Sequence, residues 1–334
     1  MAYMARTSKS PSRVLLVAYR IAQRSLPAYS HPCSPKKFTQ HQLFACLALK
    51  EFFKLDYRGV ELLLAENESL RAIIELRVAP DFTTMHKACR RLLKLPACNR
   101  LLDEMARAAR KTPLLVAPVT LAAIDSSGFE AHRASNYFVR RRDSHGKKAG
   151  KWRSLTYRRF PKLGLVCDCS SHFILAAVPH RGPSPDFDHW PEAMVQARSR
   201  VRIKTLLADA GYDAEWIHVT ARLVFDTRTL IPPNHGRPTD KLPRQYFRRR
   251  MARTFQSKRR RKRYRQRAQV ETVISQIKRR LDSSVNAHSH WSQCRALMLK
   301  ALTHNIMLLR RRQVFDTAAE SLEKARYLGR REIL

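Results

Sequence analysis

The chain has 334 residues, of which 44% are apolar, and its 65 lysines and arginines against 27 acids give a net charge of +38. This apolar content can form a sizeable core, which excludes a wholly disordered protein, and the length suits one large domain or two ordinary ones. A charge this positive is unusual for an enzyme of small molecules and favours a polyanionic partner, with nucleic acid as the first candidate. The alternatives are a membrane-surface protein and a ribosome-associated protein.

The sequence contains no apolar run long enough to cross a bilayer, and the run at residues 14–18 is too short for the core of a signal peptide. The acid-free start could also mimic an organelle transit peptide. The seven cysteines are scattered, without a CxxC pair or zinc-finger spacing, which predicts reduced thiols in the cytoplasm. Cys167 and Cys169 flank Asp168, a pattern that indicates a hairpin turn rather than a metal site.

Residues 1–35 have no strong periodicity and predict a flexible basic arm or a marginal helix. Residues 36–112 then predict a compact all-α domain, in which Thr39 and Gln42 have the spacing of a capping box. A later helix, with Thr83 as a possible N-cap, places basic residues on one face, at Lys87, Arg90 and Arg91. This face suits a helix-turn-helix that contacts a DNA groove, or equally the solvated side of a helical bundle.

The pattern changes after Pro113. Short apolar runs predict three strands, the second and third joined by a hairpin, and then a strand, a helix and another strand before long helices from residue 244. This order predicts an α/β mixed sheet flanked by helices over residues 113–310, with a C-terminal tail at 311–334.

Two basic stretches interrupt the predicted sheet domain. The first, at 140–159, has one acid, and the second, at 244–267, has none and interleaves aromatic residues. Such basic stretches are often only solvated surface or a nuclear localisation signal. Two basic stretches beside the same predicted sheet nevertheless favour contact with phosphates. The expected DNA-binding residues of the two stretches are Arg141, Arg142, Lys147, Lys148, Arg260 and Arg261. Residues 232–263 are interpreted as a basic connecting segment within the sheet domain.

Two carboxylates follow apolar runs that predict strands: Asp125 after residues 121–124 and Asp209 after 206–208. Side chains at the carboxyl ends of strands gather where ligands bind in open α/β sheets. Two such carboxylates could hold Mg²⁺ or Mn²⁺ for an in-line phosphoryl displacement. The alternative for a single aspartate after a strand is a turn or a helix cap, which is the expectation for Asp168 and, as an N-cap, for Asp213.

Glu271 is a lone acid behind the second basic stretch. On a continuous helix Tyr264, Arg267, Glu271 and Lys278 would lie within roughly 60° of one another. A neighbouring apolar stripe is expected to pack on the sheet: Val270, Val273, Ile274, Ile277 and Leu281. Glu271 would then lean toward the two aspartates, unless it belongs simply to a solvated helix face.

The spacing Tyr264-x2-Arg267-x3-Glu271-x6-Lys278 resembles the Y-R-E-K signature of DDE-type insertion-sequence transposases. The segments AAIDSSGFE and LLADAGYDAEW are similar to the surroundings of the first and second aspartate of that family, and PDFTTMHKACRRL resembles the end of its N-terminal helical region. The resemblance covers about residues 36–310. It implies a ribonuclease H-like catalytic core behind a small all-α domain.

By this resemblance Asp125, Asp209 and Glu271 would bind two Mg²⁺ ions, for which Mn²⁺ can substitute. Water would cut the ends of the element, and the freed 3′-hydroxyl would attack target DNA. Tyr264, Arg267 and Lys278 would contact the DNA backbone near the cut.

The resemblance also implies the protein's partners and surroundings. They are double-stranded DNA, as terminal inverted repeats and target, a second copy of the chain in a homodimer, and the prokaryotic cytoplasm near the nucleoid, with no membrane. Residues 233–262 contain no tryptophan, which argues against a hairpin intermediate. Two alternatives stay open: a catalytically inactive relative that binds DNA sequence-specifically, and a basic RNA-associated protein.

Overall fold

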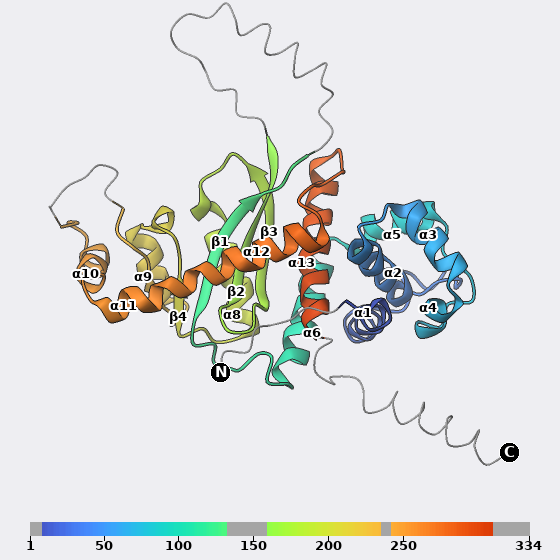
Figure 1. Ribbon diagram of the computed structural model, residues 1–334, viewed down its shortest axis with the longest axis horizontal. Helices are drawn as coiled ribbons and strands as arrows, with labels where there is room; N and C mark the ends of the chain where they lie inside the picture. Colours follow the sequence, from blue (N-terminus) through green and yellow to red (C-terminus); the bar gives the residue numbers. More distant parts are fainter. Residues whose placement is uncertain (1–8, 132–158, 235–241, 310–334) are drawn as a thin grey trace, which may run out of the picture.

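The computed structural model describes residues 9–131, 159–234 and 242–309. In Figure 1 a group of N-terminal helices stands beside a sheet with its own helices, and helix α13 (His290–Leu309) lies between the two parts. No helix in these stretches combines the length and apolar character that a membrane span requires.

The N-terminal part is all-helical. Its elements are α1 (Pro11–Ser25), α2 (Gln40–Phe53), α3 (Tyr57–Glu66), α4 (Glu68–Ile73), α5 (Phe82–Leu92) and α6 (Leu95–Arg110). The predicted capping box at the start of α2 is confirmed, because the Gln42 backbone N–H donates to Thr39 Oγ1 at 3.1 Å and the Thr39 N–H donates to Gln42 Oε1 at 2.9 Å. Helix α5 begins earlier than expected. Its N-cap is Asp81, which accepts from the Thr83 N–H at 2.7 Å, so Thr83 is not the cap.

Helix α1 lies within the segment for which the sequence predicts a flexible basic arm or a marginal helix, and residues 11–25 form the helix. Apolar side chains recur on one face of α1 and are buried, including Leu15, Ile21 and Ala22, and this face packs on α2. The arginines of α1 lie on the opposite, exposed side. This segment is therefore an amphipathic helix, although its composition is basic.

The sheet has five strands in the order β3-β2-β1-β4-β5. Their bounds are β1 (Ala122–Gly128), β2 (Phe160–Asp168), β3 (Ile174–Gly182), β4 (Thr205–Leu207) and β5 (Arg228–Leu230). Strands β1, β2 and β3 form an antiparallel meander, whereas β4 runs parallel to β1 and β5 parallel to β4. This confirms the expected ribonuclease H-like mixed sheet. The turn between β2 and β3 is also as expected, since the Asp168 carboxylate accepts hydrogen bonds from Ser170 and Ser171.

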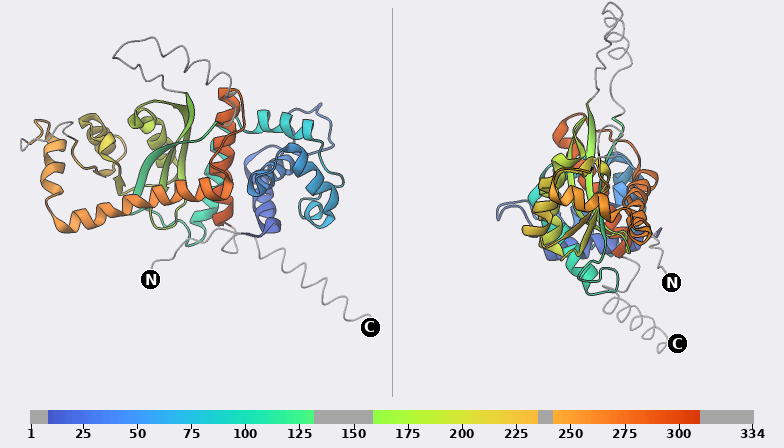
Figure 2. Two further views of the ribbon diagram at one scale, coloured as in Figure 1. Left: turned by 45° about the horizontal axis from the view of Figure 1, so that its top comes forward. Right: turned by 90° about the vertical axis from the view of Figure 1, so that its left-hand side faces the viewer.

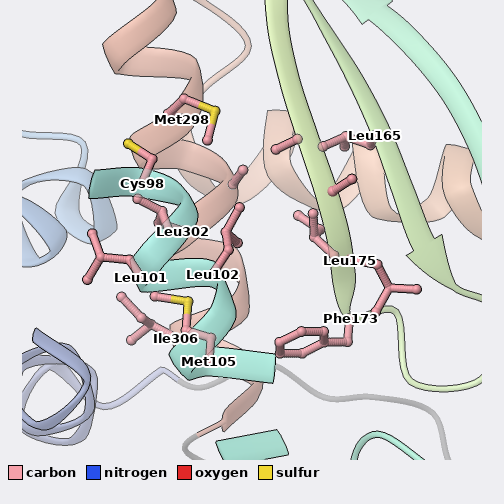
Figure 3. Packing of buried hydrophobic residues seen from close by; sticks show 14 of the residues in the cluster. Cys98, Leu101, Leu102, Met105, Leu165, Phe173, Leu175, Met298, Leu302 and Ile306 are labelled. Carbon is pink, nitrogen blue, oxygen red and sulfur yellow. The ribbon is translucent and has the colours of Figure 1, made fainter. Parts of the chain in front are cut away.

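Helices cover both faces of the sheet. Helices α8 (Trp190–Arg200) and α9 (Glu215–Leu223) follow β3 and β4 and pack behind the sheet in Figure 1. Helix α12 (Ala268–Leu281) crosses the front, where it contacts β1 and β2. Figure 3 shows how α6 and α13 interdigitate with β2 and β3 through apolar side chains such as Leu102, Leu302 and Phe173.

A buried ion pair joins the two parts of the molecule. Lys300 of α13 donates to Glu51 of α2 at 2.7 Å and also to the carbonyl oxygen of Leu281, the last residue of α12. Both side chains are almost fully buried, so each needs the other to offset the loss of hydration. The N-terminal helices are therefore fixed directly to the C-terminal end of α12.

The basic connecting segment is folded where the structure describes it, as α10 (Tyr246–Thr254) and α11 (Lys258–Tyr264). Asp213 does not cap α9 as expected. Its fully buried carboxylate instead accepts from Arg248 of α10 at 2.9 Å, while Glu215 accepts from the Phe247 backbone N–H at 2.9 Å. The Asp213 carboxylate thus holds the arginine-rich helix α10 in place, because it neutralises one of that helix's arginines.

Candidate active site

The register between β1 and β4 brings two aspartates to one place. Ala123 pairs with Leu207, the last residue of β4, so the same register continued by two residues sets Asp125 beside Asp209. Asp125 lies inside β1, which continues to Gly128 along β2, and not after the end of a strand as expected. The strand end that opens the site is that of β4. Beyond it Asp209 accepts from the Gly211 N–H at 3.3 Å.

Helix α12 carries Glu271 across the same region. The predicted apolar stripe of α12 is buried, including Val270, Val273 and Ile277, so Glu271 lies at the margin of the packed face. The helix is not continuous with α11, because a 3₁₀ turn at Arg265–Arg267 separates them. In the left view of Figure 2, α11 and α12 follow one another in a line that crosses the sheet. Tyr264 and Arg267 thus precede α12, instead of sharing one α-helix with Glu271.

The guanidinium group of Arg267 touches all three carboxylates. Its nitrogens lie 3.7 Å from Asp125 Oδ2 and 3.9 Å from Asp209 Oδ2, and it donates a hydrogen bond to Glu271 Oε1. One cation therefore holds three acids that come from β1, from the loop after β4 and from α12. About half of the Glu271 and Asp209 side-chain surface is exposed (53% and 51%), whereas that of Asp125 is 18% exposed.

The electrostatics of the site follow from this arrangement. Burial raises the pKa of Asp125 to about 6, although the Ser126 backbone N–H and Arg267 oppose the shift. Burial alone would lower the pKa of Arg267, but Tyr264 and the three carboxylates raise it above its ordinary value. The site is thus a concentration of negative charge that one arginine partly neutralises.

Tyr264 and Lys278 lie on either side of these acids. Tyr264 is half-buried against Phe255, and burial together with the nearby carboxylates raises its pKa despite Arg267. Lys278 donates to Ser127 Oγ at 2.8 Å, two residues beyond Asp125, and burial lowers its pKa. Neither side chain forms an ion pair with the three acids in the described part of the chain.

A second polar network beneath the site was missed by sequence reasoning. Asp186, from the loop after β3, accepts from Ser126 Oγ and from Lys162 Nζ, both at 2.6 Å. Its charge contributes to the raised pKa of Asp125. Lys162 is a strand residue and Asp186 lies in a proline-rich loop, so only their pairing across the sheet indicates a role.

Tyr212 and His189 complete this network behind the acids. The Tyr212 hydroxyl and His189 Nε2 are 3.1 Å apart, and His189 lies directly over Gly164, where a side chain would collide with the ring. Burial, with His180 and Lys162, lowers the pKa of His189 to about 3. These neutral buried groups fix the loop on which Asp209 lies.

The donor atoms of the site suit a hard divalent cation. All three acids supply carboxylate oxygens, the ligands that Mg²⁺ and Mn²⁺ prefer. In the described residues no three His, Cys, Asp or Glu side chains are grouped closely enough to hold a metal ion. The contacts of Arg267 give the physical reason, because a guanidinium group, instead of an ion, already lies among the three carboxylates.

The other expected DNA-binding residues are spread over the molecule. Lys87, Arg90 and Arg91 are exposed on α5, and Arg260 and Arg261 are exposed on α11. The remaining four, Arg141, Arg142, Lys147 and Lys148, lie outside the described residues.

Comparison with known proteins gives one family. The transposase DDE domain matches residues 119–306, which is more than half of the chain and spans the entire sheet and α12. No curated protein matches the chain. The ribonuclease H-like sheet agrees with this match, and the chain belongs to the family of DDE transposases.

Proposed function

We propose that this transposase cuts and joins DNA by metal-dependent phosphoryl transfer, with Asp125, Asp209 and Glu271 as the metal-binding carboxylates. The observation that carries the proposal is the contact of Arg267 with all three acids. A cation placed among three carboxylates marks where a divalent ion would be most strongly attracted. None of these acids has another basic partner within ion-pair distance in the described residues.

Two divalent ions, Mg²⁺ or Mn²⁺, would activate the attacking oxygen and stabilise the leaving oxygen of the phosphodiester. The side chains then have separate tasks. The three carboxylates would hold the ions, and Arg267 would then bind the phosphate of the DNA. Tyr264 and Lys278, on either side, fix the DNA backbone so that the reacting atoms are aligned.

The polar network of Ser126, Lys162 and Asp186 positions Asp125. The Ser126 backbone N–H donates to Asp125 Oδ1 at 2.8 Å, while the Ser126 side chain is held by Asp186. Asp125 has to be ionised to bind a metal, and its raised pKa of about 6 implies that cleavage falls as the pH drops below that value.

The substrates are double-stranded DNA in two forms, the terminal inverted repeats of the element and the target. Residues 113–310 would carry the chemistry, and the N-terminal helices, with Lys87, Arg90 and Arg91 exposed on α5, would contact the repeat. Because two ends must be cut together, the active complex is proposed to be a homodimer.

The test compares two exposed helical glutamates. Glu271→Ala should lower metal-dependent cleavage of DNA carrying the element's ends by about a thousand-fold or more, because a metal ligand is lost. Glu66→Ala, a matched exposed position on α3, should cleave like the unaltered protein. Both variants should bind the DNA normally. If Glu271→Ala cleaves as fast as Glu66→Ala, Glu271 belongs to a solvated helix and the proposed metal site is wrong.

A further inference from the structure

Strand β5 is an edge strand of the sheet and pairs with β4. Arginines from three elements lie at this edge. Arg228 is the first residue of β5, Arg222 lies on α9, and Arg263 lies on α11. These elements are brought together by the fold and not by sequence proximity, because α11 returns to the sheet after α10.

Hydrogen bonds fix two of these arginines on opposite faces of the sheet. On the α9 face, Arg222 donates to Thr229 Oγ1 at 2.7 Å. On the α11 face, Arg263 donates to Thr205 Oγ1 at 3.2 Å. Thr205 pairs with Arg228 in the parallel register, so Arg228 shares the face of Arg263, since side chains alternate along a strand. Guanidinium groups therefore surround the edge strand.

Three further arginines join this group, and we call the whole set the arginine edge: Arg222, Arg228, Arg250, Arg259, Arg260 and Arg263. After burial, the charges of Arg250 and Arg228 lower the pKa of Arg222. Burial and the charges of Arg260, Arg228 and Arg259 likewise lower the pKa of Arg263. Arg222 and Arg263 are thus each close enough to other arginines of this set to be repelled by them.

The acids near the arginine edge are engaged elsewhere. Asp226 pairs with Arg202 at 2.5 Å, and Glu215 accepts from two backbone N–H groups at the start of α10. In the described part of the chain none of the six arginines forms an ion pair. Unneutralised like charges destabilise a fold, so their convergence needs a polyanion to offset it.

We propose that the arginine edge binds the phosphate backbone of duplex DNA at a place away from the phosphodiester that reacts. The reacting site lies beyond the carboxyl end of β4, at Asp209, whereas the arginine edge surrounds the amino end, at Thr205. Four residues of extended chain separate these points by about 13 Å. A few charges would be enough to keep an edge strand from pairing with another chain, and six arginines from four elements exceed that need. The proposal rests on DNA being the substrate and not on the roles of the three acids.

The test removes three exposed arginines whose side chains make no hydrogen bond to the described residues: Arg228→Gln, Arg250→Gln and Arg259→Gln, combined in one variant. The control has the same charge change on α1 and α6: Arg13→Gln, Arg100→Gln and Arg110→Gln. Binding of a fluorescent 30-base-pair duplex without terminal-repeat sequence is measured by anisotropy in EDTA over a range of NaCl concentrations. Each lost phosphate contact lowers the slope of log affinity against log salt by about 0.9.

The edge variant should lose a slope of about 2.7 and bind at least about tenfold more weakly at low salt, while the control keeps the slope of the unaltered protein. An unchanged slope for the edge variant overturns the proposal. So does an equal loss in the control, because general charge would then explain it. Glu271→Ala should keep the full slope in the same assay, so a failure of the metal proposal is seen separately.

Discussion

The two ends of the short strand β4 handle charge in opposite ways. Beyond its carboxyl end three acids gather around one arginine, Arg267, and near its amino end lie six arginines that form no ion pair in the described part of the chain. Each end is therefore complementary to a different ligand. The acids attract cations, and the arginine edge attracts phosphates.

The difference also shows which end the protein neutralises for itself. The acids have Arg267 to reduce their repulsion while no metal is bound, whereas the six arginines have no ion-pair partner in the described residues. Removing a cation should thus have opposite consequences at the two ends: it increases repulsion among the acids and relieves it among the arginines.

Among single changes of an arginine or of a supporting residue, the largest effect is expected at the acid end, from Arg267→Ala. Without the guanidinium group nothing competes for the three carboxylates, so Mn²⁺ should bind about tenfold more tightly in calorimetric titration. Cleavage should nevertheless fall about a hundred-fold, since Arg267 no longer binds the phosphate. Arg267→Lys keeps the charge and should change the Mn²⁺ affinity less. Weaker Mn²⁺ binding by Arg267→Ala would show that this arginine does not compete with the metal.

A smaller effect concerns the network that supports the acid end. The folded pKa of His189, about 3, lies below its unfolded value near 6.5, so stability is complete above pH 6.5 and is lost as the pH falls toward 3. At pH 5 this histidine should lower the free energy of unfolding by about 2 kcal/mol relative to pH 7.5. His189→Gln should lack that part of the loss in urea titrations at the two pH values.

The control for this pH dependence is His31→Gln, at an exposed position. It should retain the whole acid-induced loss of stability. An identical pH dependence for His189→Gln and the unaltered protein would mean that His189 is not held neutral beneath the site.

The smallest effect is expected at the arginine edge. Arg228→Gln removes one of several repelling charges, so it should raise the stability of the DNA-free protein by a few tenths of a kcal/mol at low salt. Because salt screens exposed charges, the gain should vanish near 0.5 M NaCl. A loss of stability at low salt would mean that Arg228 has a favourable partner at this edge.

The fold could be predicted well from the sequence because it depends on local patterns. A few neighbouring residues are enough to recognise each of these patterns: the apolar runs of strand length, the hairpin turn at Asp168 and the capping box at Thr39. Helix α1 was predicted only as one of two alternatives, for the opposite reason. Its arginines dominated the composition, although its apolar face has helical spacing.

The candidate site was only partly predictable. The identities of Asp125, Asp209 and Glu271 could be proposed from their surroundings in the sequence, but their grouping around Arg267 depends on the register of β1 with β4 and on the 3₁₀ turn before α12. Such features are set by long-range packing.

The supporting residues were harder still to predict. Lys162 and Asp186 are 24 residues apart, and nothing in the sequence around either one indicates a role. Only the fold brings them into contact. Likewise Asp213 has the sequence position of a cap, yet the many arginines of α10 give it a stronger partner.

Anomalous diffraction from crystals of this transposase grown with Mn²⁺ tests the metal-binding role of the three acids. We expect anomalous density in contact with Asp125, Asp209 and Glu271, with the Arg267 guanidinium group withdrawn from them. Crystals in which Arg267 still bridges the three acids and Mn²⁺ binds only elsewhere, even with DNA present, would contradict this role.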